Sequence, residues 1–428
     1  MRVFLDHIGC RLNEAELATW RRELEAEGHR TVAALDEAEV AVLNSCGVTA
    51  AAARDSRRRT RQIHRQNPAV RIVLTGCFAT LEPDAAARLA GVDLVVGNAR
   101  KSTLVPTMLA ALDEGLAPRA ATEPGAPIHP TAGRTRAFVK IQDGCRNRCT
   151  FCIVTVARGE ERSRPIPEIC DEIDAMHAAG HQEAVLTGVH IGGYGHEQGD
   201  DLVALLDAVL ERTRIPRIRL GSLEPWDLPD GLFERWADPR LQPHLHLPLQ
   251  SGSDPVLRRM ARRCPTDRYR ALVARARAAI PDLHLTTDII VGFPGSTAAD
   301  HARTLAFLDE MGFGDVHVFT YSHREGTPAA RFQGALDGPT KRTRSAEVRA
   351  HVARLRRAAL AARIGETRPV LFEGSPRPTE AGVRFQGYTD TFQRVVVELP
   401  VERPLRGAVL PVRLEAMEDD TRLRGTLI

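Results

Sequence analysis

The composition describes a large chain that can bury a hydrophobic core and carries little net charge. Its 428 residues are 43% hydrophobic, and their formal net charge is +3. This length favours two or three domains over one, and so small a charge gives no overall field that attracts nucleic acid. No stretch reaches the roughly 18 apolar residues of a membrane span, and the start MRVFLDHIGC is too short and too acidic for a secretory signal. We therefore expect a cytoplasmic protein of several domains with no membrane partner.

The cysteine and arginine content indicates which kinds of site the chain can form. Eight cysteines in a large cytoplasmic chain favour metal ligation or redox chemistry over disulfides, because a reducing compartment keeps thiols free. The basic residues are almost all arginine, since lysine occurs only at Lys101, Lys140 and Lys341. Arginine suits phosphate binding, but a coding bias of the source genome would explain the same pattern.

Residues 2–98 alternate strand-like apolar runs with helical patterns. The strand-like runs are VFLDHIGC, AEVAVLNSCG, RIVLTGC and DLVVGN, and this alternation predicts βαβ units and a parallel sheet. Three of these runs end in a cysteine, at Cys10, Cys46 and Cys77. Because the carboxyl ends of parallel strands face the ligand crevice of an open sheet, we expect the three thiols to converge at one edge. The alternative is a chance placement.

A stretch rich in proline, glycine and small residues, from about residue 101 to 134, is typical of an inter-domain linker. Six strand-like segments separated by helical stretches then predict an incomplete (β/α)6 barrel of the TIM type, with its chemistry at the carboxyl ends of the strands. These segments are AFVKI, AVLTG, IRLGS, HLHLP, LTTDIIVGF and VHVFT.

The last part of the chain combines a basic helical pattern with short strands. The helical pattern follows Pro339, and segments such as VRFQGYTD and QRVVVELP come after it. Short alternating segments with turn residues between them predict a small all-β barrel. The expected fold class is therefore α/β: an open parallel α/β sheet, a partial TIM-like barrel and a small all-β barrel.

The most specific motif is GCRNRCTFC, which places Cys145, Cys149 and Cys152 directly after the first barrel strand. Three thiolates in one tight loop can hold three corners of a [4Fe–4S] cube and leave the fourth iron open. An open iron can chelate S-adenosylmethionine (SAM) and pass one electron into its sulfonium, which gives methionine and a 5′-deoxyadenosyl radical. A zinc site is the alternative, although zinc ribbons favour two CxxC pairs and four ligands.

The CxxxCxxC triplet, with Phe151 before its last cysteine, resembles the radical-SAM signature. Together with the N-terminal cysteines and the β-rich end, it makes the whole chain resemble the radical-SAM methylthiotransferase family. The resemblance implies a second [4Fe–4S] cluster on Cys10, Cys46 and Cys77 that binds the transferred sulfur, two uses of SAM per turnover, a reductase as electron donor and a sulfur donor. It also implies three domains: 1–110 with the auxiliary cluster, 131–363 with the radical-SAM core and basic helix, and 364–428 as a TRAM-like RNA-binding domain.

Within this family, the motifs IGCRLNEAE, LTGVHIGGYG, SLEPWD, HLPLQSGS and FTYSHREGTPAA are most similar to the branch that acts on N6-threonylcarbamoyladenosine at position 37 of tRNA. The resemblance therefore implies methylthio transfer to C2 of that base, in the anticodon stem-loop. Isopentenyladenosine in tRNA and a ribosomal-protein aspartate are alternative substrates. A non-catalytic iron–sulfur tRNA-binding protein is the alternative from another class. The sequence departs from the family at NSC, GCFAT and IVTVARG, none of which removes a proposed ligand.

Further residues are expected near SAM because they lie at strand ends, in turns or beside the cysteine triplet. They are Phe151, Thr187, Gly188, Glu224, Gln250, Ser251, Asp288 and Gly292. Ordinary loop hydrogen bonding, or a structural carboxylate at Asp288, would explain the same residues. Cys170 and Cys264 are expected to be structural.

Four residues are candidates for contact with substrate or RNA. Arg57 and Arg58 lie in a basic helical pattern, His190 lies in the loop LTGVHIGGYG, and Tyr388 lies in the terminal module. Basic side chains bind phosphate, and aromatic rings stack on unpaired bases. The alternatives are a solvated helix face, a histidine satisfied by packing and hydrogen bonds, and packing in a small core.

Overall fold

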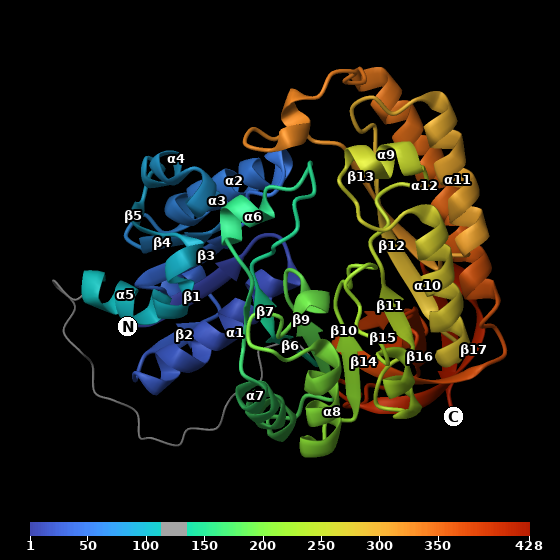
Figure 1. The fold of residues 1–428 in the computed structure, drawn as a ribbon. Helices are drawn as coiled ribbons and strands as arrows, with labels where there is room; N and C mark the ends of the chain where they lie inside the picture. The colour runs from blue at the N-terminus through green and yellow to red at the C-terminus, as the bar shows by residue number, and fades with distance from the viewer. Residues whose placement is uncertain (113–134) are drawn as a thin grey trace. The chain divides into compact units, whose positions relative to one another are not determined.

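The computed structural model describes residues 1–112 and 135–428. The chain divides into two compact units (Figure 1). Most of the expected linker lies outside the described residues, but its beginning forms helix α5 (Leu104–Leu112), which the sequence pattern did not predict. The first unit comprises Met1–Ile128, Asp143–Glu161 and Ser322–Ala330, and the second comprises His129–Gln142, Arg162–Tyr321 and Arg331–Ile428.

The first unit is built on a five-stranded parallel sheet. The runs VAVLNS and RIVLTG are buried along nearly their whole length, as expected for parallel strands covered on both faces. The predicted open parallel sheet is confirmed, with one short edge strand added. In their order across the sheet the strands are β2 (Arg30–Val32), β1 (Arg2–His7), β3 (Val40–Ser45), β4 (Arg71–Gly76) and β5 (Val92–Val96).

Helices cover both faces of this sheet (Figure 1). Trp20 of α1 and Met108 of α5 pack on one face, while Ile63 of α2 and Phe78 of α3 pack on the other. Besides α5, the unit contains α1 (Arg11–Ala26), α2 (Ala50–Gln66), α3 (Cys77–Leu81), α4 (Pro83–Ala87) and α6 (Val154–Arg158), with 3₁₀ turns η1 (Leu35–Glu37) and η2 (Asn98–Thr103).

The second unit contains the six predicted barrel strands. They pair as two parallel three-stranded sheets, and isolated parallel bridges from Ile218 to Leu241 and from Ser222 to His246 join the two sheets. Six parallel strands therefore form an open barrel wall, which confirms the predicted partial barrel. The strands are β10 (Arg217–Leu220), β9 (Glu183–Thr187) and β6 (Arg136–Lys140) in one sheet, and β11 (His244–His246), β12 (His284–Val291) and β13 (Asp315–Thr320) in the other.

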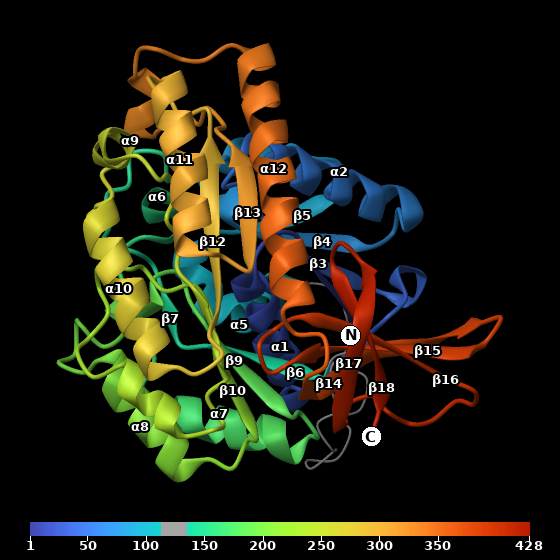
Figure 2. The same cartoon turned by 90° about the vertical axis from the view of Figure 1, so that its right-hand side faces the viewer.

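Helices α7, α8, α10, α11 and α12 of the second unit bury apolar residues in one large core with these strands. Helices α11 and α12 lie along β12 and β13 (Figure 2). Thr297 and Asp300 form a capping box at the start of α11. The helices are α7 (Ile166–Ala178), α8 (Leu202–Arg212), α9 (Asp254–Arg259), α10 (Thr266–Ala279), α11 (Ala298–Met311) and α12 (Gly338–Ala361), with 3₁₀ turns η3 (Ile191–Gly193) and η4 (Phe233–Ala237). The turn η5 (Pro328–Arg331) lies at the boundary between the two units, and all but its last residue belongs to the first. Short strands β7 (Gln142–Asp143) and β8 (Arg162–Ser163) precede and follow the cysteine loop in the chain.

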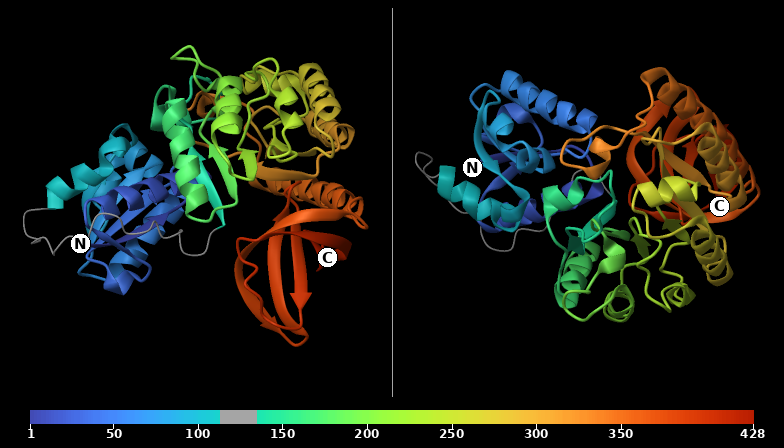
Figure 3. Two further views of the ribbon diagram at one scale, coloured as in Figure 1. Left: turned by 90° about the horizontal axis from the view of Figure 1, so that it is seen from below. Right: turned by 45° about the horizontal axis from the view of Figure 1, so that its top comes forward.

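The C-terminal residues form a closed five-stranded β-barrel, as predicted (Figure 3). Phe372, Phe385, Val395 and Leu414 lie in its core, and Leu360 of α12 packs against them. The last strand was not predicted. In barrel order the strands are β14 (Thr367–Thr379), β15 (Gly382–Thr389), β16 (Arg394–Leu399), β18 (Arg422–Leu427) and β17 (Val409–Asp419).

A buried ionic group joins the β-barrel to the partial barrel. Glu183 accepts hydrogen bonds from Arg217 at 2.9 Å and from Arg219 at 3.0 Å. The same arginines donate to the backbone carbonyls of Thr389 and Asp390 at 3.1 Å. Because Glu183 and Arg217 are the first residues of β9 and β10, the β-barrel packs at the amino ends of the strands, opposite the end where the chemistry is expected.

Among residues 1–112 and 135–428, the structure contains no helix that is both long enough and apolar enough to cross a membrane.

The Glu183 group gives a prediction about stability. Glu183→Gln would leave two buried guanidinium groups without their carboxylate, and we expect a loss of about 3–5 kcal/mol in the free energy of unfolding. Asp207→Asn is the matched control, because the Asp207–Arg235 pair is largely exposed and should be worth no more than about 1 kcal/mol. Urea unfolding followed by circular dichroism measures both. Equal losses in the two variants would contradict the role given to Glu183.

Candidate functional site

The first cysteine trio lies at the carboxyl ends of three adjacent strands. Cys10 is the N-cap of α1 after β1, Cys46 directly follows β3, and Cys77 directly follows β4 as the first residue of α3. A Cβ atom built on Gly9 would lie only 2.9 Å from the Cys46 sulfur, so glycine is required there. Burial raises the pKa of the Cys46 thiol, and the nearby thiols of Cys77 and Cys10 raise it further. The structure thus brings the three predicted thiols together.

Polar side chains fix the backbone around this trio. The Ser56 hydroxyl accepts from the Cys46 amide at 3.0 Å and donates to the Cys46 carbonyl at 2.8 Å. The Asn13 amide group donates to the Ile8 carbonyl at 2.8 Å, and Asn44 donates to the Asn13 carbonyl at 3.1 Å. The segment around Cys10 is therefore tied to β3, the strand that Cys46 follows. None of these positions could be identified from the motifs alone.

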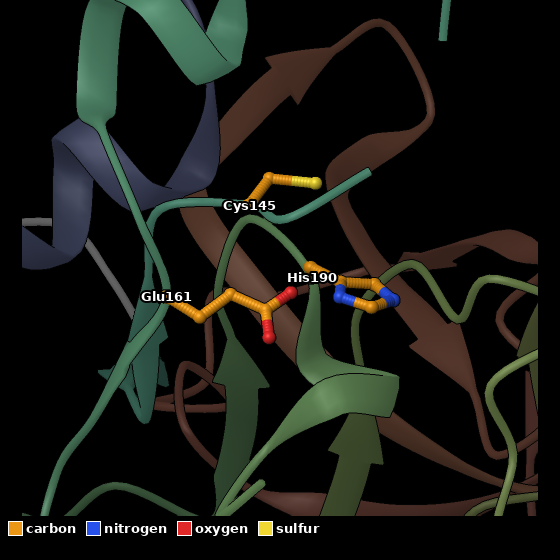
Figure 4. Close-up of side chains that lie close together, drawn as sticks. All are labelled: Cys145, Glu161 and His190. Carbon is orange, nitrogen blue, oxygen red and sulfur yellow. The ribbon is translucent and has the colours of Figure 1, made fainter. Parts of the chain in front are cut away.

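The second trio occupies one loop of the first unit. The amides of Asn147 and Val154 donate to the sulfurs of Cys145 and Cys152, each at 3.4 Å, and such N–H···S bonds favour the thiolate form that binds metal. The Cys145 amide donates to the Gly159 carbonyl at 3.1 Å, which closes the loop. Cys145 and Glu161 project from its two arms (Figure 4), and the buried Glu161 carboxylate accepts from the Arg146 amide at 3.2 Å.

The spacing of the cysteine sulfurs distinguishes a site for a single zinc ion from a site for a [4Fe–4S] cluster. A tetrahedral zinc ion, with bonds of about 2.3 Å to sulfur, needs its thiolates within about 4 Å of one another. The groups of metal-ligating atoms that lie within 4.8 Å of one another in the described residues include neither cysteine trio. Three thiols per site at wider spacing fit three corners of a [4Fe–4S] cluster better than a single ion.

A buried ionic network lies beside both trios within the first unit. Arg158, six residues after Cys152, donates to Asp143 at 2.9 Å and to Glu16 at 3.2 Å. Lys101 contacts the other oxygen of Glu16. Burial alone would lower the pKa of Arg158, but Glu16 and Asp143 hold it above its ordinary value, so the guanidinium stays charged. The sequence carried no signal for this network, because its members are far apart in the chain.

The backbone after β9 is held by the protein itself. Gln142 accepts hydrogen bonds through its Oε1 from the amides of Val189 at 3.0 Å and His190 at 2.8 Å. A Cβ on Gly188 would lie 2.9 Å from the Gln142 carbonyl oxygen. Glycine is needed here for close packing within the fold, and Thr187 ends β9 with its carbonyl bonded to the Ile141 amide. Contact of Thr187 and Gly188 with SAM stays a prediction.

The residues after β10 and β11 also have partners within the second unit. Glu224 pairs with Arg262 at 2.8 Å, and Arg262 lies over the ring of Trp226. The Ser251 hydroxyl lies within hydrogen-bond distance of the Thr304 hydroxyl and accepts a hydrogen bond from the amide of Ser253. Both partners of this hydroxyl therefore belong to the protein. Gln250 is buried with φ +72°, a left-handed conformation that side-chain-bearing residues rarely adopt and that concentrates at functional sites.

Asp288 lies in the middle of β12 and contacts two histidines. Its Oδ1 is 3.2 Å from His246 Nε2 on β11 and 3.1 Å from His317 Nδ1 on β13. Burial would raise the pKa of Asp288, but these histidines hold it well below its ordinary value. Gly292, with φ +76°, forms the turn after the strand, where a Cβ would meet Lys341. A turn that needs glycine is therefore present, and its contact with SAM stays a prediction.

Two substrate candidates, His190 and Tyr388, occupy packed positions, as in the alternatives stated for them, and contact of either residue with substrate stays a prediction. His190 is fully buried, with Nε2 3.0 Å from the Asp227 carboxylate. Tyr388 is half-buried and stacked on Phe392 at 4.9 Å, with Arg136 4.8 Å from its ring centre. Both rings pack within the second unit, because each finds a polar or aromatic neighbour distant in the sequence.

Both candidate arginines of α2 have an acidic partner. Arg57 contacts Glu82 at 3.1 Å and lies over the Phe78 ring. Arg58 is exposed and forms a pair with Asp55 at 2.9 Å. Phe151, in the cysteine loop, is half-buried. Cys170 and Cys264 are buried, and burial raises the pKa of Cys264 to about 11, which suits inert packing residues.

Comparison with protein families matches both units. The pattern described as the Radical SAM superfamily matches residues 139–308, and that described as Uncharacterized protein family UPF0004 matches residues 2–97. Among solved structures, the radical SAM methyltransferase TsrM from Kitasatospora setae, with cobalamin and a [4Fe–4S] cluster bound, has a TM-score of 0.53 at 14% identity and covers 77% of this chain and 76% of its own. The cobalamin-dependent radical SAM enzyme OxsB has a TM-score of 0.51 at 12% identity, over 82% and 56%. At such identities these likenesses concern the fold alone.

Closer relatives carry more specific names. Threonylcarbamoyladenosine tRNA methylthiotransferase MtaB of Thermotoga maritima is 37% identical, over 80% of this chain and 80% of its own. The protein of the same name from Bacillus subtilis is 35% identical, over 91% and 88%. The tRNA-2-methylthio-N(6)-dimethylallyladenosine synthase of Methylococcus capsulatus is 34% identical, over 97% of both chains.

The open barrel, the CxxxCxxC loop and the superfamily match define a radical-SAM enzyme. The relatives named methylthiotransferases align over most of this chain, which makes the assignment more specific. The chain belongs to the radical-SAM methylthiotransferase family, whose members use SAM and [4Fe–4S] clusters. The resemblance stated from the motifs is thus confirmed.

Two sets of three ligands predict two clusters. After anoxic reconstitution we expect about eight irons and eight sulfides per chain, and about four of each when Cys10, Cys46 and Cys77 are replaced by alanine. Iron and sulfide assays measure this. Replacement of Cys170 and Cys264, buried outside both trios, should leave the iron content unchanged. Tightly bound zinc in place of iron would contradict both sites.

Proposed function

We propose that the chain transfers a methylthio group to C2 of N6-threonylcarbamoyladenosine at position 37 of tRNA, in place of the C2 hydrogen. The observation that carries the proposal is the presence of two cysteine trios in one compact unit. Support for this base comes from the two relatives named for it, which are 37% and 35% identical. The identity to the dimethylallyladenosine enzyme is nearly as high, 34%, so the substrate needs a direct test.

Each trio would hold one [4Fe–4S] cluster. Cys145, Cys149 and Cys152 would bind the cluster that reacts with SAM, and the first trio would bind the auxiliary cluster. When bound, these groups and two molecules of SAM would supply the radical, the sulfur and the methyl group. The protein keeps the thiols placed: Cys10 lies at the N-terminus of a 16-residue helix, whose dipole favours negative charge. SAM would be held by the candidate residues at the barrel strands.

The C-terminal barrel would bind the RNA as a TRAM-like domain. Exposed arginines on it offer phosphate contacts: Arg377, Arg403, Arg406, Arg413 and Arg424. Because Tyr388 is packed against Phe392, these arginines are better candidates than that ring. The target adenosine would be presented unpaired, which an anticodon loop permits at modest unstacking cost.

The remaining parts of the assignment follow from the family. The chain would receive electrons from a reductase and sulfur from a separate donor, in the cytoplasm. We propose the domain division 1–110, 131–363 and 364–428 for this purpose, with the cysteine loop of the second domain packed on the first. A non-catalytic tRNA-binding protein is the rival from another class, since basic helices and a β-barrel would suffice for binding.

The proposed reaction predicts release of 5′-deoxyadenosine. Reconstituted enzyme with SAM, dithionite and an anticodon stem-loop bearing N6-threonylcarbamoyladenosine should release it and form the 2-methylthio nucleoside, as seen by mass spectrometry. Cys149→Ala should reduce both to background, because the cluster would lose one of its three ligands. Cys264→Ala, at a buried cysteine outside both trios, should retain both.

The substrate is decided by competition. An equimolar mixture of stem-loops bearing threonylcarbamoyl- and isopentenyladenosine should yield the 2-methylthio product mainly from the first. Preference for the second would assign the chain to the other branch. If the mixture released no 5′-deoxyadenosine, the result would favour the non-catalytic tRNA-binding protein.

A further inference from the structure

Arg158 connects the two cysteine trios within the first unit. It is the last residue of α6, which follows Cys152 in the cysteine loop. It is 5% exposed. Its guanidinium donates to the Asn13 side-chain oxygen at 2.8 Å, and Asn13 is the residue whose amide group ties the Cys10 loop to β3. One buried side chain of the second cysteine loop therefore reaches the support of the first trio.

A second link runs in parallel. Asn98, in η2, donates to the Ala157 carbonyl at 2.6 Å and lies 3.7 Å from the Cys77 sulfur. Its amide group thus touches both the residue before Arg158 and a thiol of the first trio. Hydrogen bonds to ligand sulfurs are among the factors that set the potential of an iron–sulfur cluster.

The charges around the first trio are buried and close to its sulfurs. Arg158 interacts electrostatically with Cys77 and Cys10, and Lys101 does so with Cys77. Glu16, between the two cations, partly offsets them. In a buried site such charges are poorly screened by water or salt. A positive charge next to a cluster with thiolate ligands stabilises the reduced, more negative form.

We propose that Arg158 is a positioning residue that ties the cysteine loop to the first trio and that its buried charge raises the reduction potential of the auxiliary cluster. This inference rests on the proposed function, since it requires a cluster on Cys10, Cys46 and Cys77. Arg158 is not itself a ligand. In this proposal the loop that carries Cys145, Cys149 and Cys152 also supplies the charge that tunes the auxiliary cluster.

The test isolates the auxiliary cluster. In the full chain with Cys145, Cys149 and Cys152 replaced by alanine, only the first trio can hold iron, and the ratio of reduced to oxidised cluster is read by electron paramagnetic resonance at a fixed solution potential. Arg158→Gln should lower this ratio about tenfold, which corresponds to about 59 mV for a one-electron couple. Arg158→Lys, which keeps the charge, should stay within about twofold, because potential follows charge here.

Arg71→Gln is the matched control. Arg71 is the first residue of β4, and Cys77 follows the last residue of that strand, so the two are separated by about 20 Å at 3.3 Å per residue. The control should leave the ratio unchanged. Glu16→Gln, which removes a negative charge from the same network, should raise the ratio, and this opposite sign provides a second reading if Arg158→Gln fails to fold.

Each outcome decides a different question. Failure of the triple-alanine protein to bind iron would remove the auxiliary cluster and the proposed function with it. A cluster that forms with full iron content but has the same potential in Arg158→Gln as in the parent would overturn the tuning role alone. An unchanged or lower ratio in Glu16→Gln would overturn it as well.

Discussion

The structure depends on one geometric constraint, the meeting of adjacent parallel strands at a common edge. β1, β3 and β4 are neighbours in the sheet, and each is followed by a cysteine that forms no disulfide. Their chain separations of 36 and 31 residues become short distances only because the strands run parallel and in register. In an antiparallel neighbour the carboxyl end would lie at the opposite end of the strands, away from the other cysteines. The topology therefore creates the ligand set, and the residues around it refine the geometry.

Buried charge is the second feature that requires explanation. Glu16, Lys101, Asp143 and Arg158 are all less than a tenth exposed, and taking such groups out of water is costly unless each finds a partner. Here every one is paired. An apolar cluster of the same volume would hold the loop equally well. The retention of charge beside the thiols is therefore better explained by electrostatic control of the site than by stability alone.

The sequence predicted those features that depend on local patterns. Apolar runs ending in Cys10, Cys46 and Cys77 indicated strands, and the CxxxCxxC spacing indicated a ligand loop. It did not identify Asn13 or Arg158, because their roles arise from pairs 145 residues apart. The same limit applies to Tyr388, a candidate for stacking on a base with core packing as the alternative: its contacts with Phe392 and Arg136 are set by tertiary packing, which no local pattern indicates. Strands β2 and β18 were missed because they are short edge or terminal segments.

The division of the chain has a mechanical consequence. The loop Asp143–Glu161 is inserted between strands of the second unit, yet it belongs to the first. Both cysteine trios, and the Arg158 and Asn98 links between them, thus lie inside one compact body. The separation of the two trios is therefore fixed by packing within a single unit. The proposed reaction must bring a radical and a sulfur to the same carbon. Such a reaction needs the two clusters held at a fixed distance, which packing within one unit provides.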